Sequence, residues 1–161
     1  MKTKLFFSVA FITISMLLNA KGKPDGYVVT DVDTIACKSL SFGYDGANIT
    51  LANGEKTLVN KENVKAYSLN GKKFENLPVY VDGKPNGNNS FLELVAERNG
   101  LKLFKYSYYD TNGWDATKSV EDMKKVTVLT IFKDNKYYVQ VDQKNAKTIL
   151  PYFNLNEYAL E

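Results

Sequence analysis

Tight-turn dipeptides between short alternating runs of β-branched and aromatic residues constrain the fold of this chain more than any other feature. Two such pairs of runs are residues 64–69 and 72–81 around Asn70-Gly71, and residues 91–98 and 101–109 around Asn99-Gly100. Both dipeptides accept the positive φ angles that a two-residue primed turn requires. Each pair therefore predicts an antiparallel β-hairpin.

Three further pairs of runs show the same pattern around other turn residues. They are residues 27–30 and 34–42 around 31–33, residues 48–51 and 57–59 around 52–55, and residues 126–133 and 136–142 around 134–135. In residues 101–109 apolar side chains alternate onto both faces of the strand, which fits a sheet buried on both sides. We predict an all-β fold with minor α content, in which antiparallel hairpins form a sandwich or a curled barrel.

One or two short helices accompany the predicted strands. Residues 119–125 begin with a capping serine and carry acids in the first turn and lysines in the last, which matches the helix dipole. Residues 144–150 are expected to form a short helix that stops at Pro151. The least ordered stretches are predicted at residues 82–89 and 110–117, which are rich in turn-forming residues.

The amino terminus has the three-part pattern of a secretory signal peptide. Two lysines precede an apolar run over residues 5–18, and Ala20 supplies a small residue at the expected cleavage site. The run has about 14 residues, whereas a membrane-spanning helix needs roughly 20. A lipid anchor would need a cysteine directly after the run, but the only cysteine is Cys37. The sequence predicts a signal peptide over residues 1–20 and a secreted or periplasmic product without a transmembrane anchor.

Residues 21–161 show no linker, composition break or internal repeat and are predicted to form one β-rich domain. Removal of the two leader lysines lowers the formal charge of +3 by two, to +1. Lysines alternate with acids and Arg98 is the sole arginine, so the clustered positive charge typical of nucleic-acid binding is absent. Because one cysteine cannot form an internal disulfide, the domain needs an ordinary core, in which Cys37 is expected to pack.

The chain contains no histidine, and this excludes Ser-His-Asp and Cys-His catalysis as well as the usual zinc sites. Carboxylates remain as acid/base groups, and a pair about 5–9 Å apart could support glycoside hydrolysis. The acids considered are Asp31, Asp33, Glu93, Glu97, Asp110 and Asp115. Their spacing selects no pair and lacks the ligand order of a calcium loop. We therefore predict no catalytic residue, no metal site and no cofactor.

Aromatic residues gather in the second half of the chain, where most are expected to fill a β core and its rim. Trp114 differs because it lies in a polar Asn-Gly-Trp-Asp loop where no strand demands an aromatic. An exposed aromatic side chain can stack on a sugar or anchor a protein partner. Trp114, Tyr109 and Asp115 are the predicted partner-binding residues.

Several stretches of the chain resemble segments of a known group of proteins. Residues 26–30 with Asp33-Thr34-Ile35 resemble its opening strand and turn, residues 61–67 its middle segment, and residues 91–95 with 101–106 its central hairpin. The group consists of uncharacterised exported β-rich proteins of Bacteroidetes, without an established activity, and usually has glycine where this chain has Val32. The resemblance implies an envelope context and an O-glycosylation motif at Thr34, although a hairpin turn explains the same residues.

The sequence favours a non-enzymatic binding or structural module of the bacterial cell envelope, whose partner is an envelope protein or a glycan. Export, the missing catalytic constellations and the loop at Trp114 support this hypothesis. The alternative is a carboxylate-based hydrolase acting on glycans, which requires two acids in one concave pocket. A third interpretation is a structural subunit that joins others through its sheet edges.

Overall fold

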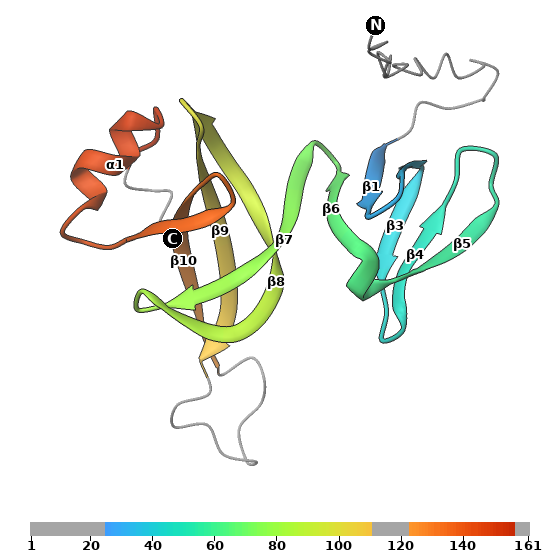
Figure 1. The fold of residues 1–161 in the computed structure, drawn as a ribbon, viewed down its shortest axis with the longest axis horizontal. Helices are drawn as coiled ribbons and strands as arrows, with labels where there is room; N and C mark the ends of the chain where they lie inside the picture. Colours follow the sequence, from blue (N-terminus) through green and yellow to red (C-terminus); the bar gives the residue numbers. More distant parts are fainter. Residues whose placement is uncertain (1–24, 111–122, 157–161) are drawn as a thin grey trace, which may run out of the picture.

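The computed structural model describes residues 25–110 and 123–156, which form two antiparallel sheets, one 3₁₀ helix and one α-helix (Figure 1). The elements are β1 (Gly26–Thr30), β2 (Thr34–Cys37), β3 (Ser39–Phe42), β4 (Gly46–Thr50), β5 (Lys56–Asn60), η1 (Lys61–Asn63), β6 (Val64–Leu69), β7 (Lys72–Val81), β8 (Lys84–Arg98), β9 (Leu101–Asp110), β10 (Lys124–Lys133), β11 (Lys136–Val141) and α1 (Ala146–Tyr152). The larger sheet has the order β11-β10-β9-β8-β7-β6-β1-β2, and the smaller has the order β3-β4-β5. The predicted all-β fold is confirmed.

The hairpins predicted from the turn dipeptides are present. β6 pairs with β7 across Asn70-Gly71, and β8 pairs with β9 across Asn99-Gly100. Each of these turn residues has a φ between 51° and 76°, as a primed turn requires. β10 and β11 form a similar hairpin across Asp134-Asn135, whose φ angles are 51° and 60°. β4 and β5 also pair as predicted.

The single strand predicted over residues 34–42 is divided in two. β2 belongs to the larger sheet and β3 to the smaller, with the exposed Lys38 between them. The break carries the chain from one layer to the other, so that both layers enclose one core. That core contains Val28 and Cys37 from the larger sheet, Ala47 and Ile49 from the smaller, and Val64.

Strands β8 to β11 contribute apolar side chains to cores on both faces of the sheet. Leu103 and Phe104 are neighbours on β9, and both are fully buried. Because consecutive side chains of a strand point to opposite faces, these two residues mark separate cores. The core around Leu103 is covered by α1, and the core around Phe104 is enclosed by the curved β7–β8 hairpin (Figure 1). The prediction of two buried faces for residues 101–109 is confirmed.

The larger sheet curls but stays open. At the tip of the β7–β8 hairpin the Gly83 N–H donates to Gln140 Oε1 at 3.0 Å, and Tyr80 stacks on Tyr137 with 4.1 Å between ring centroids. Within the described residues β7 and β11 are nevertheless not paired as strands. Of the two predicted arrangements, the open sheets agree with a sandwich and not with a closed barrel.

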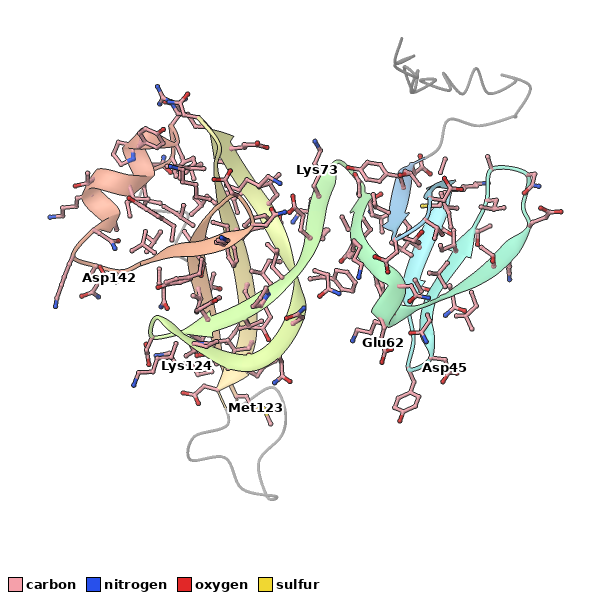
Figure 2. All side chains as sticks on the ribbon, in the orientation of Figure 1. Asp45, Glu62, Lys73, Met123, Lys124 and Asp142 are labelled. Carbon is pink, nitrogen blue, oxygen red and sulfur yellow. The ribbon has the colours of Figure 1, made fainter. Side chains whose placement is uncertain are left out.

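An aromatic cluster joins the first half of the molecule, β1 to β6, to the second half, β7 to β11 with α1. Tyr67 of β6 stacks on Phe74 of β7 with 4.5 Å between ring centroids. Phe42 of β3 and Phe91 of β8 both pack against Tyr67, at 5.0 Å and 5.1 Å. Lys73 lies on β7 beside this junction (Figure 2). The rings therefore connect the smaller sheet to the strands of the second half.

Two predictions of irregular or helical structure were wrong in part. Residues 84–89 were expected to be poorly ordered, but they lie in β8, because β7 pairs with them as far as Val81 and Lys84. Lys124 and Lys125, expected at the end of a helix, begin β10 and pair with β9. Their backbone groups complete the β9–β10 ladder, which a helix would leave unpaired. The remainder of that predicted helix and of the loop at residues 110–117 lies largely outside the described residues.

The predicted C-terminal helix is present as α1, but it continues through Pro151 to Tyr152. Pro151 lacks a backbone N–H, so it donates no hydrogen bond within the last turn of α1. The helix end is closed by two bonds, in which the N–H of Leu155 donates to the carbonyl of Leu150 and that of Asn154 donates to Pro151. Asn154 has the left-handed φ of 60° typical of this cap. No helix among the described residues is long and apolar enough to cross a membrane.

Candidate functional site

Three hollows on the surface differ in what lines them. One of ≈ 470 Å³ lies on the outer face of the three-stranded sheet, and one of ≈ 320 Å³ lies between η1 and the β7–β8 hairpin. Both have mixed polar and apolar linings. The third, of ≈ 200 Å³, lies between α1 and the larger sheet and is lined almost wholly by apolar atoms. We call it the apolar recess.

Walls of the apolar recess come from separate parts of the chain. They include Leu101 of β9, Ile131 of β10, Tyr138 and Val139 of β11, and Ile149 and Tyr152 of α1. Ile131 is buried, whereas Tyr138 is 61% exposed. A cavity of about 150 Å³ holds a benzene molecule. The recess can therefore accept one large apolar side chain or ring.

The recess is open because α1 is too short to cover the sheet. Its seven residues give a helix about 10 Å long, which is anchored by the buried Ala146 and Leu150. Beside it the β10–β11 register shifts, so that Tyr138 is an extra residue between the paired Tyr137 and Val139. A bulge of this kind redirects a side chain, and here it leaves Tyr138 at the rim.

Hydrogen bonds at both ends of α1 hold the walls in place. At the carboxyl end Arg98 Nη1 donates to the Tyr152 carbonyl at 2.5 Å, and the guanidinium lies 5.0 Å from the centroid of the Tyr152 ring. Asn99 Nδ2 donates to Tyr152 Oη at 3.1 Å. At the amino end, Asp142 (Figure 2) and Asn145 each accept from the other's backbone N–H through a side-chain oxygen, at 3.0 Å and 2.9 Å. A preformed site loses less entropy on binding.

Tyr109, the predicted partner-binding residue that the structure describes, does not line the apolar recess. Tyr109 is 54% exposed near the end of β9, eight residues from Leu101, which is roughly 26 Å along an extended strand. Trp114 and Asp115 lie outside the described residues. Sequence reasoning missed Tyr138 and Ile149, whose proximity depends on how α1 packs on β11. The consecutive tyrosines 137 and 138 were an available signal, because only one of them can face a given core.

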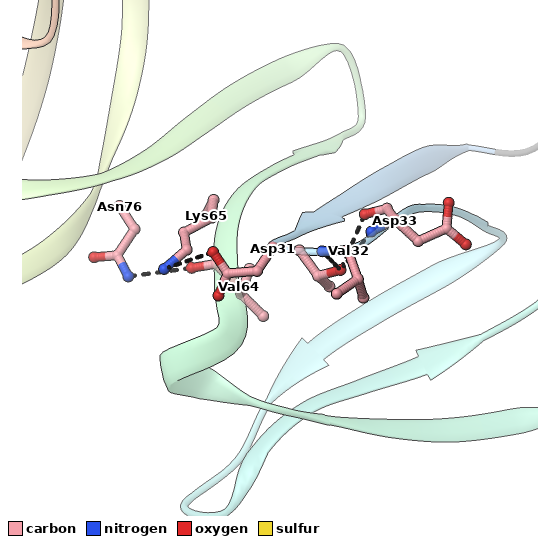
Figure 3. Close-up of polar contacts among 7 residues, drawn as sticks. Asp31, Val32, Asp33, Val64, Lys65 and Asn76 are labelled. Atoms are coloured by element: carbon pink, nitrogen blue, oxygen red, sulfur yellow. Dashed lines mark hydrogen bonds and ion pairs between the residues drawn. The ribbon is translucent and has the colours of Figure 1, made fainter. Parts of the chain in front are cut away.

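Three acids among the described residues, Asp31, Glu75 and Glu93, form ion pairs with lysines. Asp31 Oδ1 lies 3.2 Å from Lys65 Nζ (Figure 3), and Glu93 Oε1 lies 3.0 Å from Lys72 Nζ. Of the three hollows, only the one beside η1 contains a carboxylate, that of Glu62. No group of three or more His, Cys, Asp or Glu residues in the described ranges could hold a metal ion. Asp115 lies outside those ranges.

The motif Asp33-Thr34-Ile35 lies at the end of the β1–β2 turn. Thr30 Oγ1 accepts from the N–H of Asp33 at 3.0 Å (Figure 3), and Asp33 Oδ1 accepts from the N–H of Thr34 at 2.6 Å. Val32, which replaces the group's usual glycine, does not have a positive φ, so this turn does not require glycine. Thr34 itself is exposed.

Among the described residues, the pKa values of two side chains are raised, and both residues lie in the first half of the molecule. Burial raises the pKa of the Cys37 thiol, and Asp25 adds to the effect. Burial also raises the pKa of Tyr67, with Glu93 adding to it. A thiol with a raised pKa is protonated at neutral pH and unreactive. The prediction that Cys37 is packed in the core is confirmed.

Comparison of the chain with protein-family models, with curated proteins and with solved structures finds no match in any of the three. The geometry of the apolar recess is therefore the basis on which a function can be argued.

Proposed function

We propose that this protein is a non-enzymatic binding module of the bacterial cell envelope that captures a partner protein through the apolar recess. The observation that carries the proposal is the recess itself, a preformed apolar hollow of ≈ 200 Å³ with the exposed Tyr138 at its rim. Small-molecule sites usually enclose about 300–1,000 Å³. A hollow below that range suits one anchor side chain of a protein interface.

The lining favours a protein over a glycan as the partner. Sugar hydroxyls that enter an apolar hollow lose hydrogen bonds to water without replacement, which is unfavourable. An aliphatic or aromatic side chain loses none and gains apolar contact with Leu101, Ile131 and Ile149. The Tyr138 ring at the rim can pack over such an anchor and offer its hydroxyl to surrounding polar groups.

Export of the module is supported by the sequence. The lysine-bearing start, apolar run and Ala20 predict a cleaved leader over residues 1–20. The resemblance of residues 26–35, 61–67 and 91–106 to exported Bacteroidetes proteins supports the same location. All the named walls of the recess belong to residues that remain after cleavage near Ala20. We therefore propose that the recess acts in the periplasm or outside the cell.

The test compares capture of envelope proteins by the mature domain and by three variants. Tyr138→Ala removes the aromatic ring at the rim of the apolar recess. Thr148→Arg, at an exposed position of α1, places a long charged side chain across the opening of the recess. Tyr44→Ala is the matched control, because Tyr44 is fully exposed in the distant β3–β4 loop next to Asp45 (Figure 2). We expect quantitative mass spectrometry to show a specific protein retained by wild type and Tyr44→Ala but depleted at least tenfold by both recess variants. Equal capture by all four proteins would overturn the proposal.

A further inference from the structure

The edge strands of the two sheets differ in how well they are protected. Among the described residues the larger sheet ends at β2 and β11, and the smaller sheet ends at β3 and β5. An edge strand presents unpaired N–H and C=O groups and is a template for pairing with another chain. β2 and β3 have only four residues each. The longer edges, β5 and β11, therefore determine whether the molecule can pair.

At β11 side chains occupy the free backbone groups. The N–H of Gln140 donates to Tyr137 Oη at 3.1 Å, and its carbonyl accepts from Asn145 Nδ2 at 2.9 Å. The Gln140 side chain in turn holds Gly83, which brings the β7–β8 tip over the strand. Together with the bulge at Tyr138, these contacts protect the edge from further pairing.

At β5 the register identifies which backbone groups are free. The N–H of Leu51 donates to the carbonyl of Glu55 at 2.8 Å, which closes the β4–β5 hairpin with a hydrogen-bonded pair. Hydrogen-bonded and non-bonded pairs alternate along an antiparallel ladder. In the observed register the groups of Thr57 and Val59 then point toward β4. The backbone N–H and C=O groups of Lys56, Leu58 and Asn60 point the other way, to the open edge of the sheet.

This edge is uncovered in the part of the chain that the structure describes. There, no side chain donates to or accepts from the backbone of Lys56 or Leu58. Leu58 is 56% exposed although it is a large apolar residue. β5 lies on the outer side of the smaller sheet, at the opposite end of the molecule from α1 (Figure 1). The edge thus combines free backbone groups with exposed apolar surface.

We propose that β5 pairs antiparallel with β5 of a second copy of this chain, with Leu58 opposite Leu58, to form a continuous six-stranded sheet. The outward groups at 56, 58 and 60 are symmetric about Leu58, as a two-fold interface requires. Each opposing pair of residues exchanges two hydrogen bonds. The two Leu58 side chains cover each other's exposed surface.

The charges on β5 and its flanks fit this register. Lys56 lies opposite Asn60 of the second copy, so that like charges do not oppose. The next pair after Lys56 and Asn60 brings Glu55 toward Lys61 of the second copy, and both residues are exposed. A slip by two residues in either direction would separate the two Leu58 residues and would move Glu55 away from Lys61 of the second copy. Because two five-residue strands cover less than the roughly 1,200 Å² of a stable interface, we expect a weak and reversible dimer.

The test is sedimentation velocity of the mature chain over a concentration series, combined with amide hydrogen exchange. We expect the sedimentation coefficient to rise with concentration and the exchange of the Lys56 and Leu58 amides to slow with it. The amides of Thr57 and Val59 are an internal control, because they already face β4 and are expected to keep their exchange rates.

Two variants test whether Leu58 of β5 lies at the dimer interface. Leu58→Lys places like charges at the two-fold axis and is expected to weaken association at least tenfold. Tyr44→Lys adds the same charge at a fully exposed loop position of the same sheet and is expected to associate as wild type does. A monomer at every concentration, or a dimer that persists in Leu58→Lys, would overturn the proposal. Tyr138→Ala is expected to dimerise normally, which separates this result from that of the apolar recess.

Discussion

The two halves of the molecule use their strands differently. In the first half, β1 to β6, one core lies between two sheet layers, and no residue of β5 is buried. In the second half, β7 to β11 with α1, strands β8 to β11 support a core on each face, and residues 128–132 of β10 are all buried. The second half therefore has little surface left to offer except where α1 fails to cover it. The first half leaves its outer sheet face and the β5 edge accessible.

The largest effects are expected from substitutions in the cores of the two halves. Phe104 is fully buried and packs edge-to-face on Phe132, with 5.5 Å between ring centroids. Phe104→Ala is expected to lower the free energy of unfolding by about 3–5 kcal/mol, and Ile49→Val in the first half by about 0.5–1.5 kcal/mol. Urea denaturation followed by circular dichroism measures both. A loss below about 1 kcal/mol for Phe104→Ala would contradict the assignment of a second core.

A smaller effect, confined to the second half, is expected from Arg98→Ala. The substitution removes the hydrogen bond and the ring contact to Tyr152, which together are expected to contribute about 1–3 kcal/mol. Amide exchange should accelerate in α1 and stay unchanged in β4. Arg98→Lys is the control, because it keeps the charge but lacks the planar fork, and we expect only partial rescue. Unchanged exchange in α1 would show that Arg98 does not hold the helix.

The smallest effect is a loss of stability at alkaline pH that originates in the first half and its junction. Below the ordinary pKa values of 9.0 for Cys37 and 10.0 for Tyr67, both groups are protonated in the folded and the unfolded chain. Above those values each group ionises in the unfolded chain before it does so in the folded chain, because its pKa in the folded chain is raised. The free energy of unfolding therefore falls as the pH rises from the ordinary pKa of each group toward its raised pKa in the folded chain. Urea midpoints at about pH 8 and pH 10.5 measure the loss.

Two variants assign the alkaline loss to its groups. Cys37→Ala is expected to remove the part that begins near the thiol's ordinary value, and Tyr67→Phe the part that begins at higher pH, since each variant lacks the ionising group. Tyr67→Phe also keeps the ring that stacks on Phe74. If both variants lose as much stability as wild type over the same pH range, other groups are responsible.

Sequence predicted this fold well where local chemistry decides the backbone. Asn70-Gly71 and Asn99-Gly100 readily accept positive φ angles, and both hairpins formed with the expected strands. The break at Lys38 was missed, although the apolar alternation changes phase there, from Ile35 and Cys37 to Leu40 and Phe42. Residues 84–89 have turn-forming composition, yet pairing with β7 makes them a strand. For residues 84–89, tertiary contacts overrode the local signal.

The candidate site was less predictable than the fold. The apolar recess needs Leu101, Tyr138 and Ile149 from separate elements, and the bulge that exposes Tyr138 has no signature in the sequence. The length of α1 was close to the prediction, but its failure to cover the sheet depends on where it docks. Tyr109, Trp114 and Asp115 remain a prediction about a different part of the surface.

The place of β1 in the larger sheet sets the order in which the two halves can be completed during synthesis. β1 lies between β2 and β6, and Gly26 pairs with Leu69, roughly 40 positions later, so its loop closure is entropically expensive. From β6 to β11 each strand instead pairs with its neighbour in sequence, and such local pairs form quickly. The first half is therefore complete only when its last strand, β6, is in place, and until then β1 presents a free edge in addition to the edge of β5.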